Sequence, residues 1–402
     1  MARTKSTLVD SIDDAVNHIT KLFLQQCTYG AQTKALPSEF AACGQFIGED
    51  AATIPQHGFH GISAALRVLG PCTSDECRAL VQRLVSYCEA CFGIHPTLTL
   101  ERNDLVDDTE NVIKLGELLY ALAFVPAAQV ENRLVRHVAK RLREAAIDNK
   151  GWGYFIGESI PQLLPTAYAL RGLAKHGYDV NFAREFILNA LRTGGQSEHS
   201  SASDVTTAIA SIFCITFSSE TSAEQTAELR EHFASAWRAL ESLMGEDVEQ
   251  NVEYWHGSET HYVRIPWQMY LLSLASQLSF WRFASFRSQT RLRALVESVR
   301  SDSFGYPYSG THLSSRTNSI AYDILTIIRG NLRRFFALRV GYLIDRTRVI
   351  AGSRPVRVLA SLIAAVIILY SIGQWWTKAD AADLAPKFVA SILVWMLALG
   401  RR

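Results

Sequence analysis

The chain has 402 residues, of which 48% are hydrophobic, and its formal net charge is +1. This apolar fraction is ample for a large core and excludes an intrinsically disordered chain. The charge is unevenly distributed: residues 329–402 hold 12 Lys or Arg and 3 Asp or Glu, which leaves 28 basic and 36 acidic residues, a net −8, in the first 328. An acidic body argues against a nucleic-acid partner, whereas a basic segment beside apolar runs is typical of a membrane surface.

The first 14 residues contain no apolar run, so we expect no signal peptide. Seven cysteines is an odd number, and most lie in helix-like sequence, which indicates buried thiols in a reducing compartment. Cys72, Cys77, Cys88 and Cys91 could also be read as zinc ligands, but their spacing is unusual for such a site. We therefore predict no metal, and the sequence leaves the cofactor unknown.

Amphipathic and apolar helical patterns alternate along the chain. Amphipathic helices are predicted at about 8–27, 73–92, 130–147, 180–193, 223–243 and 284–300. Between them lie apolar helices, one around Ala65–Arg67, one with its apolar positions at Ala167, Leu170, Leu173 and Ala174, and others at about 108–124, 204–216, 269–278 and 318–329. No alternation of period two persists between these helices, so we expect no strands.

A repeat of roughly 50 residues underlies this alternation, and its clearest unit is 148–177. Each unit joins a Gly- and aromatic-rich turn to an apolar helix, which here Gly177 is placed to end. The turn at 153–158 matches residues 44–49, and Ala169-Leu170-Arg171 matches Ala65-Leu66-Arg67. The repeat predicts an all-α fold, an (α/α)6 toroid of alternating outer and inner helices over residues 1–330. Its long loops would gather over the N-termini of the inner helices, where backbone N–H groups favour an anion.

After residue 330 the sequence changes character. Residues 331–353 form a basic amphipathic linker, and residues 354–402 contain two apolar runs, at about 356–372 and 384–400. These runs predict a C-terminal transmembrane hairpin at the short end of the spanning range, with a pair of buried core helices as the alternative. Arg354, Arg357, Arg401 and Arg402 flank the runs and predict that the toroid and both termini are cytoplasmic, at the cell inner membrane.

Ionisable and aromatic residues are frequent in the six predicted loops. Asp107, Asp108, Glu158, Glu259 and His261 are the candidate catalytic residues. The candidate ligand-binding residues are His57, His60, Trp152, Tyr154, Trp255, His256, Tyr306, Tyr308, His312 and Arg316.

Most of these residues also have a structural interpretation. Asp107 or Asp108 with Glu110 is typical of a helix N-cap. The aromatic residues Trp152, Tyr154, Tyr306 and Tyr308 could pack the turns between repeats instead of lining a pocket. His256 and His261 with their neighbouring glutamates are not at a spacing specific for a metal.

The sequences Lys150-Gly151-Trp152-Gly153-Tyr154 and 165–173 resemble the repeat of the terpenoid cyclase and protein prenyltransferase superfamily, which includes the squalene cyclases. The resemblance covers residues 6–330 and implies a site in the toroid cavity, at the N-terminal ends of the inner helices. The catalytic motifs of the family do not carry over. A D-x-D-D run is replaced by D-x-x-D-D at residues 10–14 and 104–108, and none of the six predicted loops offers a Cys near a matching Asp, as the zinc ligand set of the prenyltransferases would require.

Two classes of function fit these observations. In the first, the toroid senses a ligand or partner protein, and the hairpin perturbs the lipid bilayer as a homo-oligomer, as in bacterial defence proteins. In the second, a membrane-tethered enzyme of this fold acts on an isoprenoid, lipid-linked or glycan substrate. We favour the effector because the catalytic motifs of the family are missing, and fold alone does not fix function.

Overall fold

The computed structural model describes residues 8–33, 36–47, 58–100, 109–127, 132–194, 202–218, 222–243, 250–256, 259–264 and 313–330, with Tyr270, Ser273, Leu274, Gln277 and Leu278. Contacts divide the chain into Met1–Phe335 and Phe336–Arg402, and every described residue lies in the first unit.

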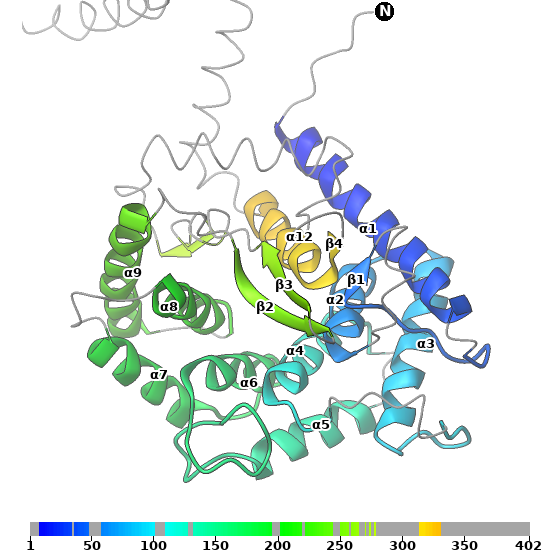
Figure 1. Cartoon of the computed structure of the whole chain (residues 1–402), viewed down its shortest axis with the longest axis horizontal. Coiled ribbons are helices and arrows are strands. Elements are labelled where there is room, and N and C mark those ends of the chain that lie inside the picture. The colour runs from blue at the N-terminus through cyan, green and yellow to red at the C-terminus, as the bar shows by residue number, and fades with distance from the viewer. Residues whose placement is uncertain are drawn as a thin grey trace, which may run out of the picture. The chain divides into compact units, whose positions relative to one another are not determined.

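Helices make up most of the described chain (Figure 1). They are α1 (Leu8–Thr33), α2 (Phe59–Leu69), α3 (Asp75–Cys91), α4 (Val112–Leu122), α5 (Asn132–Glu144), α6 (Leu163–Lys175), α7 (Asn181–Gly194), α8 (Ala202–Thr216), α9 (Ala223–Leu243) and α12 (Ser315–Gly330). The predicted helical class is therefore confirmed for the part of the chain that the structure describes.

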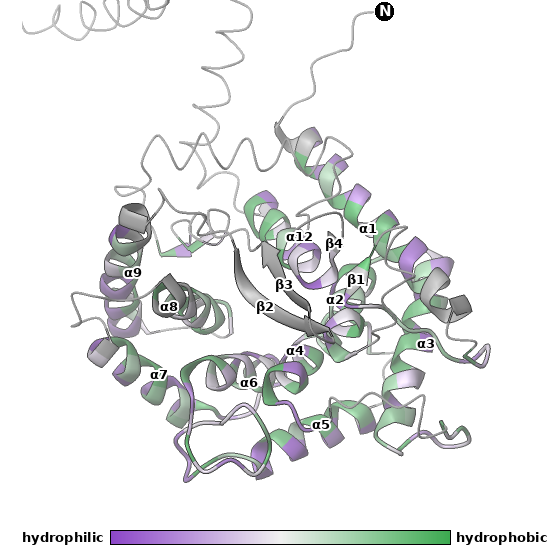
Figure 2. Ribbon diagram, in the orientation of Figure 1, coloured by the Kyte–Doolittle hydropathy of each residue, from purple (hydrophilic) through white to green (hydrophobic). Residues whose placement is uncertain are grey.

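The helices form an inner row and an outer row. In the inner row α12 packs on α2, α2 on α4, α4 on α6 and α6 on α8. In the outer row α3, α5, α7 and α9 pack on α2, α4, α6 and α8 in turn, and α1 packs on α12 and α2. The outer helices alternate hydrophilic and hydrophobic residues (Figure 2), whereas α2 and α4 are buried along nearly their whole length.

A helical turn at Leu274–Leu278 lies beside α8 and α9. The Leu278 N–H donates to the Leu274 carbonyl over 2.8 Å, and Arg230 of α9 donates its Nε to the Leu278 carbonyl. Tyr270, one turn earlier, packs edge-on against Phe213 of α8 with ring centroids 4.6 Å apart. Tyr270 and Leu278, the described residues with these contacts in the apolar segment predicted at 269–278, thus lie next to α8 and α9 respectively.

Local sequence sets the helix ends. Asn111 caps α4 because its side chain accepts the Lys114 N–H over 3.1 Å. The cap predicted at Asp107 or Asp108 is thus found at Asn111, and those two aspartates lie outside the described residues. At the end of α6, Gly177 adopts φ +77°, and Tyr178 N–H returns to the Leu173 carbonyl as in a Schellman motif. The predicted stop at Gly177 is confirmed.

Two glycines let α4 and α6 approach closely. A Cβ on Gly116 would lie 2.6 Å from the Tyr168 carbonyl oxygen, and one on Gly172 would lie 2.6 Å from the Gly116 carbonyl oxygen. Both obstacles are backbone atoms, so the two helices would have to move apart to admit any side chain.

Within the described residues, strands form two small sheets, which the sequence did not lead us to expect. Strands β1 (Phe46–Ile47) and β4 (Leu313–Ser314) pair antiparallel. Strands β2 (Gln250–His256) and β3 (Glu259–Arg264) form an antiparallel hairpin where a loop was predicted. The two runs of Val, Tyr, Trp and Thr flank Gly257-Ser258, a composition that favours a hairpin turn.

Among the described helices, none is both long and apolar enough to cross a bilayer. The predicted membrane runs at 356–372 and 384–400 lie outside the described residues, as does the linker at 331–353.

Candidate functional site

The inner helices carry charged side chains and one tyrosine at matching depths. Arg67 of α2, Tyr120 of α4, Arg171 of α6 and Asp323 of α12 each lie eight residues beyond the first residue of their helix. Side chains at the same distance from the start of their helices contact one another here, as they do when neighbouring helices run in the same direction. We call these four residues the deep layer.

The deep layer contains two arginines and one carboxylate. Asp323 Oδ2 forms an ion pair with Arg67 Nη2 and lies 3.5 Å from Arg171 Nη2. Both guanidinium groups lie over the Tyr120 ring. The ring centroid is 3.6 Å from Arg171 Cζ and 5.4 Å from Arg67 Cζ. Arg67 and Arg171 are each only 4% exposed, so this layer is a buried site with one net positive charge.

Nearer the N-termini of α2 and α12 lies a second group, here called the upper layer: His60, Glu117, Tyr168 and Arg316. Glu117 accepts from His60 Nδ1 through Oε2 and pairs with Arg316 Nε through Oε1 at 3.2 Å. Arg316 Nη2 in turn donates to the Tyr168 hydroxyl over 2.9 Å. One carboxylate thus joins α2, α4 and α12, and Arg316 extends the network to α6.

The charges in the two layers shift the pKa of several groups. Burial would raise the pKa of Glu117, but the charges of Arg316 and His60, the His60 hydrogen bond and the charge of Arg67 outweigh burial and lower it to about 2. Glu117 is therefore ionised at neutral pH. Burial lowers the pKa of Arg67, and the like charge of Arg171 lowers it further. Burial is also the main reason that the pKa of Tyr168 is raised.

This geometry supports two kinds of chemistry. Glu117 holds the Nδ1 side of His60, which leaves Nε2 as the ring nitrogen available for proton transfer. Buried guanidinium groups, on the other hand, bind anions through charge-assisted hydrogen bonds.

Two of the predicted ligand-binding residues, His60 and Arg316, are brought together by the structure. They come from α2 and α12, which are far apart in sequence, and both contact Glu117. Sequence reasoning placed both in loops, whereas each is the second residue of an inner helix.

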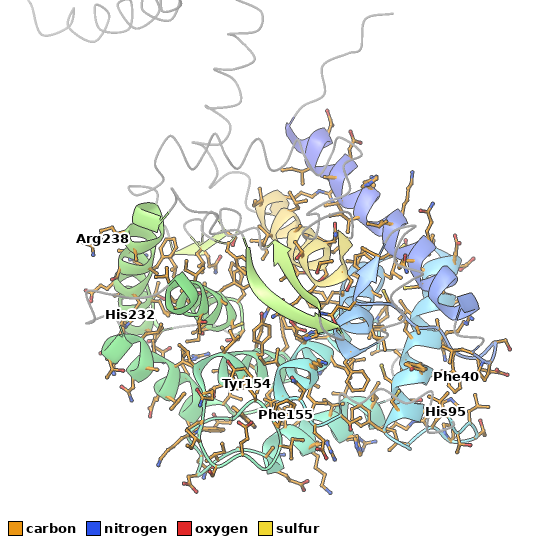
Figure 3. All side chains as sticks on the ribbon, in the orientation of Figure 1. Phe40, His95, Tyr154, Phe155, His232 and Arg238 are labelled. Atoms are coloured by element: carbon orange, nitrogen blue, oxygen red, sulfur yellow. The ribbon has the colours of Figure 1, made fainter. Side chains whose placement is uncertain are left out.

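Three predicted residues, Trp152, Tyr154 and Glu158, lie instead in the turn before α6. Trp152 is fully buried; its Nε1 donates to the Leu142 carbonyl of α5, and its ring packs on Phe182 of α7. Glu158 accepts the Tyr154 backbone N–H over 2.8 Å, and the Tyr154 side chain, labelled in Figure 3, is 41% exposed. These contacts correspond to the turn-packing role that the sequence left open.

The remaining candidates are placed only in part. Trp255 and His256 lie on β2 opposite Thr260 and Glu259 of β3, and His261 lies opposite Tyr254; only their backbone is described. His57, Asp107, Asp108, Tyr306, Tyr308 and His312 lie outside the described residues.

Sequence reasoning missed Arg67, Glu117, Arg171 and Asp323 as site residues. The signal was present, because each is a charged residue with apolar neighbours on a helix that the sequence predicts to be an inner one. Arg67 and Arg171 even occupy matching positions in two copies of the repeat. A buried charge in such a position is a reason to suspect a functional site.

The cysteines are all free thiols. Of the four weighed as zinc ligands, Cys77 and Cys88 are buried core residues on α3, and Cys72 contacts Ser74. Within the described ranges, no three His, Cys, Asp or Glu side chains are grouped as metal ligands.

Comparison of the chain with protein-family models, with curated proteins and with solved structures finds no match.

Proposed function

We propose that residues 1–330 form an (α/α)6 toroid of the terpenoid cyclase and prenyltransferase type that senses a ligand at its inner helices. The five neighbouring inner helices and the turn at Leu274–Leu278 beside α8 support this closed arrangement. In the same proposal, residues 331–402 are the effector. Their basic linker and paired apolar runs act on the bilayer of the cell inner membrane from the cytoplasmic side.

The placement of Arg316 and Asp323 carries the sensing role. Both residues belong to α12, so this one helix supplies a charge to the upper layer and to the deep layer. The same helix ends at Gly330, where the basic segment begins. A ligand that competes for either ion pair would weaken the contacts between α12 and the helices α2, α4 and α6. Because α12 is covalently continuous with the effector segment, such a change can reach that segment.

A permeabilisation experiment tests the effector role. Expression of the full chain in bacteria should collapse the membrane potential, as reported by a voltage-sensitive dye, in the presence of the ligand or trigger. Deleting residues 354–402 should abolish the collapse while the helical part remains folded by circular dichroism. An unchanged membrane potential in cells that hold the full chain at high level would count against the proposal, as would equal activity of the deletion variant.

The same proposal includes a homo-oligomer formed through the C-terminal helices, which we expect to detect by crosslinking the full chain.

One observation favours the second candidate, a membrane-tethered enzyme acting on an isoprenoid, lipid-linked or glycan substrate. The His60–Glu117 pair resembles the oriented imidazole of a general base. His60→Gln keeps a neutral polar side chain but removes the base. Incubation of the purified chain with a bacterial lipid extract, followed by mass spectrometry, should then show a product with the parent chain and none with His60→Gln. If neither forms a product, this candidate fails.

A further inference from the structure

The deep layer holds more positive than negative charge, and it is closed to solvent. Arg67 and Arg171 share the single carboxylate of Asp323, and all three residues are less than 10% exposed. A buried charge needs a partner of opposite sign, because its desolvation is otherwise uncompensated. One of the two guanidinium groups has no carboxylate of its own.

The hydrogen-bond donors of these arginines identify where a second anion would bind. Arg67 Nε, Arg171 Nε and Arg171 Nη2 are buried and have no hydrogen-bond partner in the described part of the chain. Arg171 Nη2 lies 3.5 Å from Asp323, too far or too poorly aligned for a hydrogen bond. Nε and Nη2 form one edge of the guanidinium group, and this edge binds two oxygens of one oxyanion at once.

The neighbouring aromatic rings supply no oxygen or nitrogen acceptor to this edge. Arg171 Cζ lies over the Tyr120 ring, 3.6 Å from its centroid, and over the ring of Phe213 of α8 at 5.1 Å. The π faces of these rings attract the cation and hold it in place. The three donors nevertheless remain without a hydrogen-bond partner in the described part of the chain.

We infer that Arg67 and Arg171 form a binding site for a phosphate group, gripped by the Nε–Nη2 edge of Arg171 with Arg67 as the second cation. Three donors suit a phosphate, which offers more acceptor oxygens than a carboxylate. This inference rests on the proposed function, since it names the chemistry of the ligand that the helical part senses. The phosphate is either inorganic or the terminal group of a small organic molecule.

Asp323 then has a defined part. It competes with the phosphate for the same two guanidinium groups, so phosphate binding weakens the tie between α12 and the helices α2 and α6. A variant without this carboxylate should bind phosphate more tightly, although the unliganded protein becomes less stable. A purely structural arginine cluster gives no reason for opposite effects on stability and on phosphate response.

Thermal unfolding of the full chain in detergent micelles tests the site, with inorganic phosphate and phenyl phosphate as probes and chloride at matched ionic strength. At about 100 times the dissociation constant, phosphate should raise Tm by about 5 °C over chloride.

Arg171→Lys keeps the charge but loses the two-donor edge, so its affinity for phosphate should fall at least tenfold. Asp323→Asn should show a lower Tm without phosphate and at least tenfold tighter binding. Arg83→Lys, at a half-buried arginine that donates Nε and Nη2 to the Phe40 carbonyl, is the matched control and should respond like the parent.

A stronger response to phenyl phosphate than to inorganic phosphate assigns the site to an organic phosphate, and the reverse assigns it to the free ion. The inference is wrong if phosphate shifts the parent no more than chloride does, a result that needs no variant to fold. It is also wrong if Arg171→Lys responds like the parent. A phosphate response without any collapse of membrane potential would keep this site and remove the effector role, and collapse without a phosphate response would do the opposite.

Discussion

At the scale of single residues, the described inner helices are joined by ionised side chains as well as by apolar packing. Glu117 is the clearest case, since its two oxygens separately contact His60 and Arg316. Removing one member of a buried ion network lowers the free energy of unfolding by more than the intact network adds to it, because the remaining charges stay buried without a partner. We therefore expect the upper layer to control the stability of the fold.

Glu117 should make stability fall in acid. Its pKa is about 2 in the folded chain against an ordinary value of 4.5, so the unfolded chain binds the proton first. The stabilisation is fully present above about pH 4.5 and is lost as the pH falls from 4.5 towards 2, by roughly 3 kcal/mol in total. Urea unfolding at a series of pH values should show this loss.

Glu117→Gln should be less stable than the parent at pH 7 and should lack this part of the pH dependence. Glu144→Gln is the control, at an exposed carboxylate in an i,i+4 pair with Lys140, and it should keep the parent's profile. Identical acid profiles for Glu117→Gln and the parent would contradict the assignment.

Trp152 should matter for stability through its indole N–H. Trp152→Phe removes the shorter of the two hydrogen bonds to the Leu142 carbonyl, which keeps only the 3.2 Å bond from the Ala145 N–H, and this loss costs about 0.5–1.5 kcal/mol. Chemical denaturation of the variant measures this cost. The exposed aromatic next in the turn, Tyr154→Phe, should change stability by less than about 0.5 kcal/mol. Equal effects of the two substitutions would speak against the packing role of Trp152.

At the scale of elements, helical periodicity was enough to predict where the described helices lie and which ones are inner. In α2 and α4 apolar residues occur on all sides of the helix, whereas in α3 and α5 they are confined to one side, and this difference separates inner from outer helices. The hairpin of β2 and β3 was missed because each run is short and a polar aromatic segment also fits a loop. Contacts such as Glu117 with Arg316 depend on which helices become neighbours, which local pattern does not encode.

Close approach of α4 and α6 gives a prediction at this scale. Gly172→Ala would place a methyl group 2.6 Å from the Gly116 carbonyl oxygen, so the helices must separate, at a cost of about 1–3 kcal/mol or more. The separation should also weaken the response to phosphate, because Arg171 is the preceding residue. Gly330→Ala is the control, since its added Cβ would meet nothing within 4 Å. Unfolding midpoints of the two variants compare them directly, and a Gly172→Ala protein as stable as the parent would exclude the close crossing.

At the scale of the helical unit, the first helix completes the surroundings of the last. Helix α1 packs on α12 and α2, and Arg329 near the end of α12 pairs with Asp13 over 2.8 Å. On its inward side Ile12, Ile19 and Phe23 are fully buried. The beginning and the end of the described chain therefore belong to one cooperative structure.

Deletion of residues 1–33 tests this cooperativity. Loss of three buried side chains alone removes about 5–9 kcal/mol of hydrophobic stabilisation, which is comparable with the whole stability of a typical domain. We expect the truncated chain to lose its cooperative thermal transition in circular dichroism. Deleting only residues 1–6 should leave the transition unchanged, and a normal transition after removal of 1–33 would show that α1 is dispensable.

The contact that joins β4 and α12 to the first repeat can form only late in protein synthesis, because its two partners are far apart in the sequence. Ser315 donates both its backbone N–H and its hydroxyl to the Gln45 carbonyl, 270 residues earlier. At about 5–20 residues per second, the ribosome needs roughly 15–55 s to make the intervening chain. Once Arg67 and α2 have been made, they lack Asp323 and α12 for the rest of that interval, and Arg171 lacks Asp323 from its own synthesis onward. The nascent chain should therefore depend on chaperones until the last inner helix emerges, and the basic, apolar segment from residue 331 onward is synthesised only after every charge of the two layers has been made.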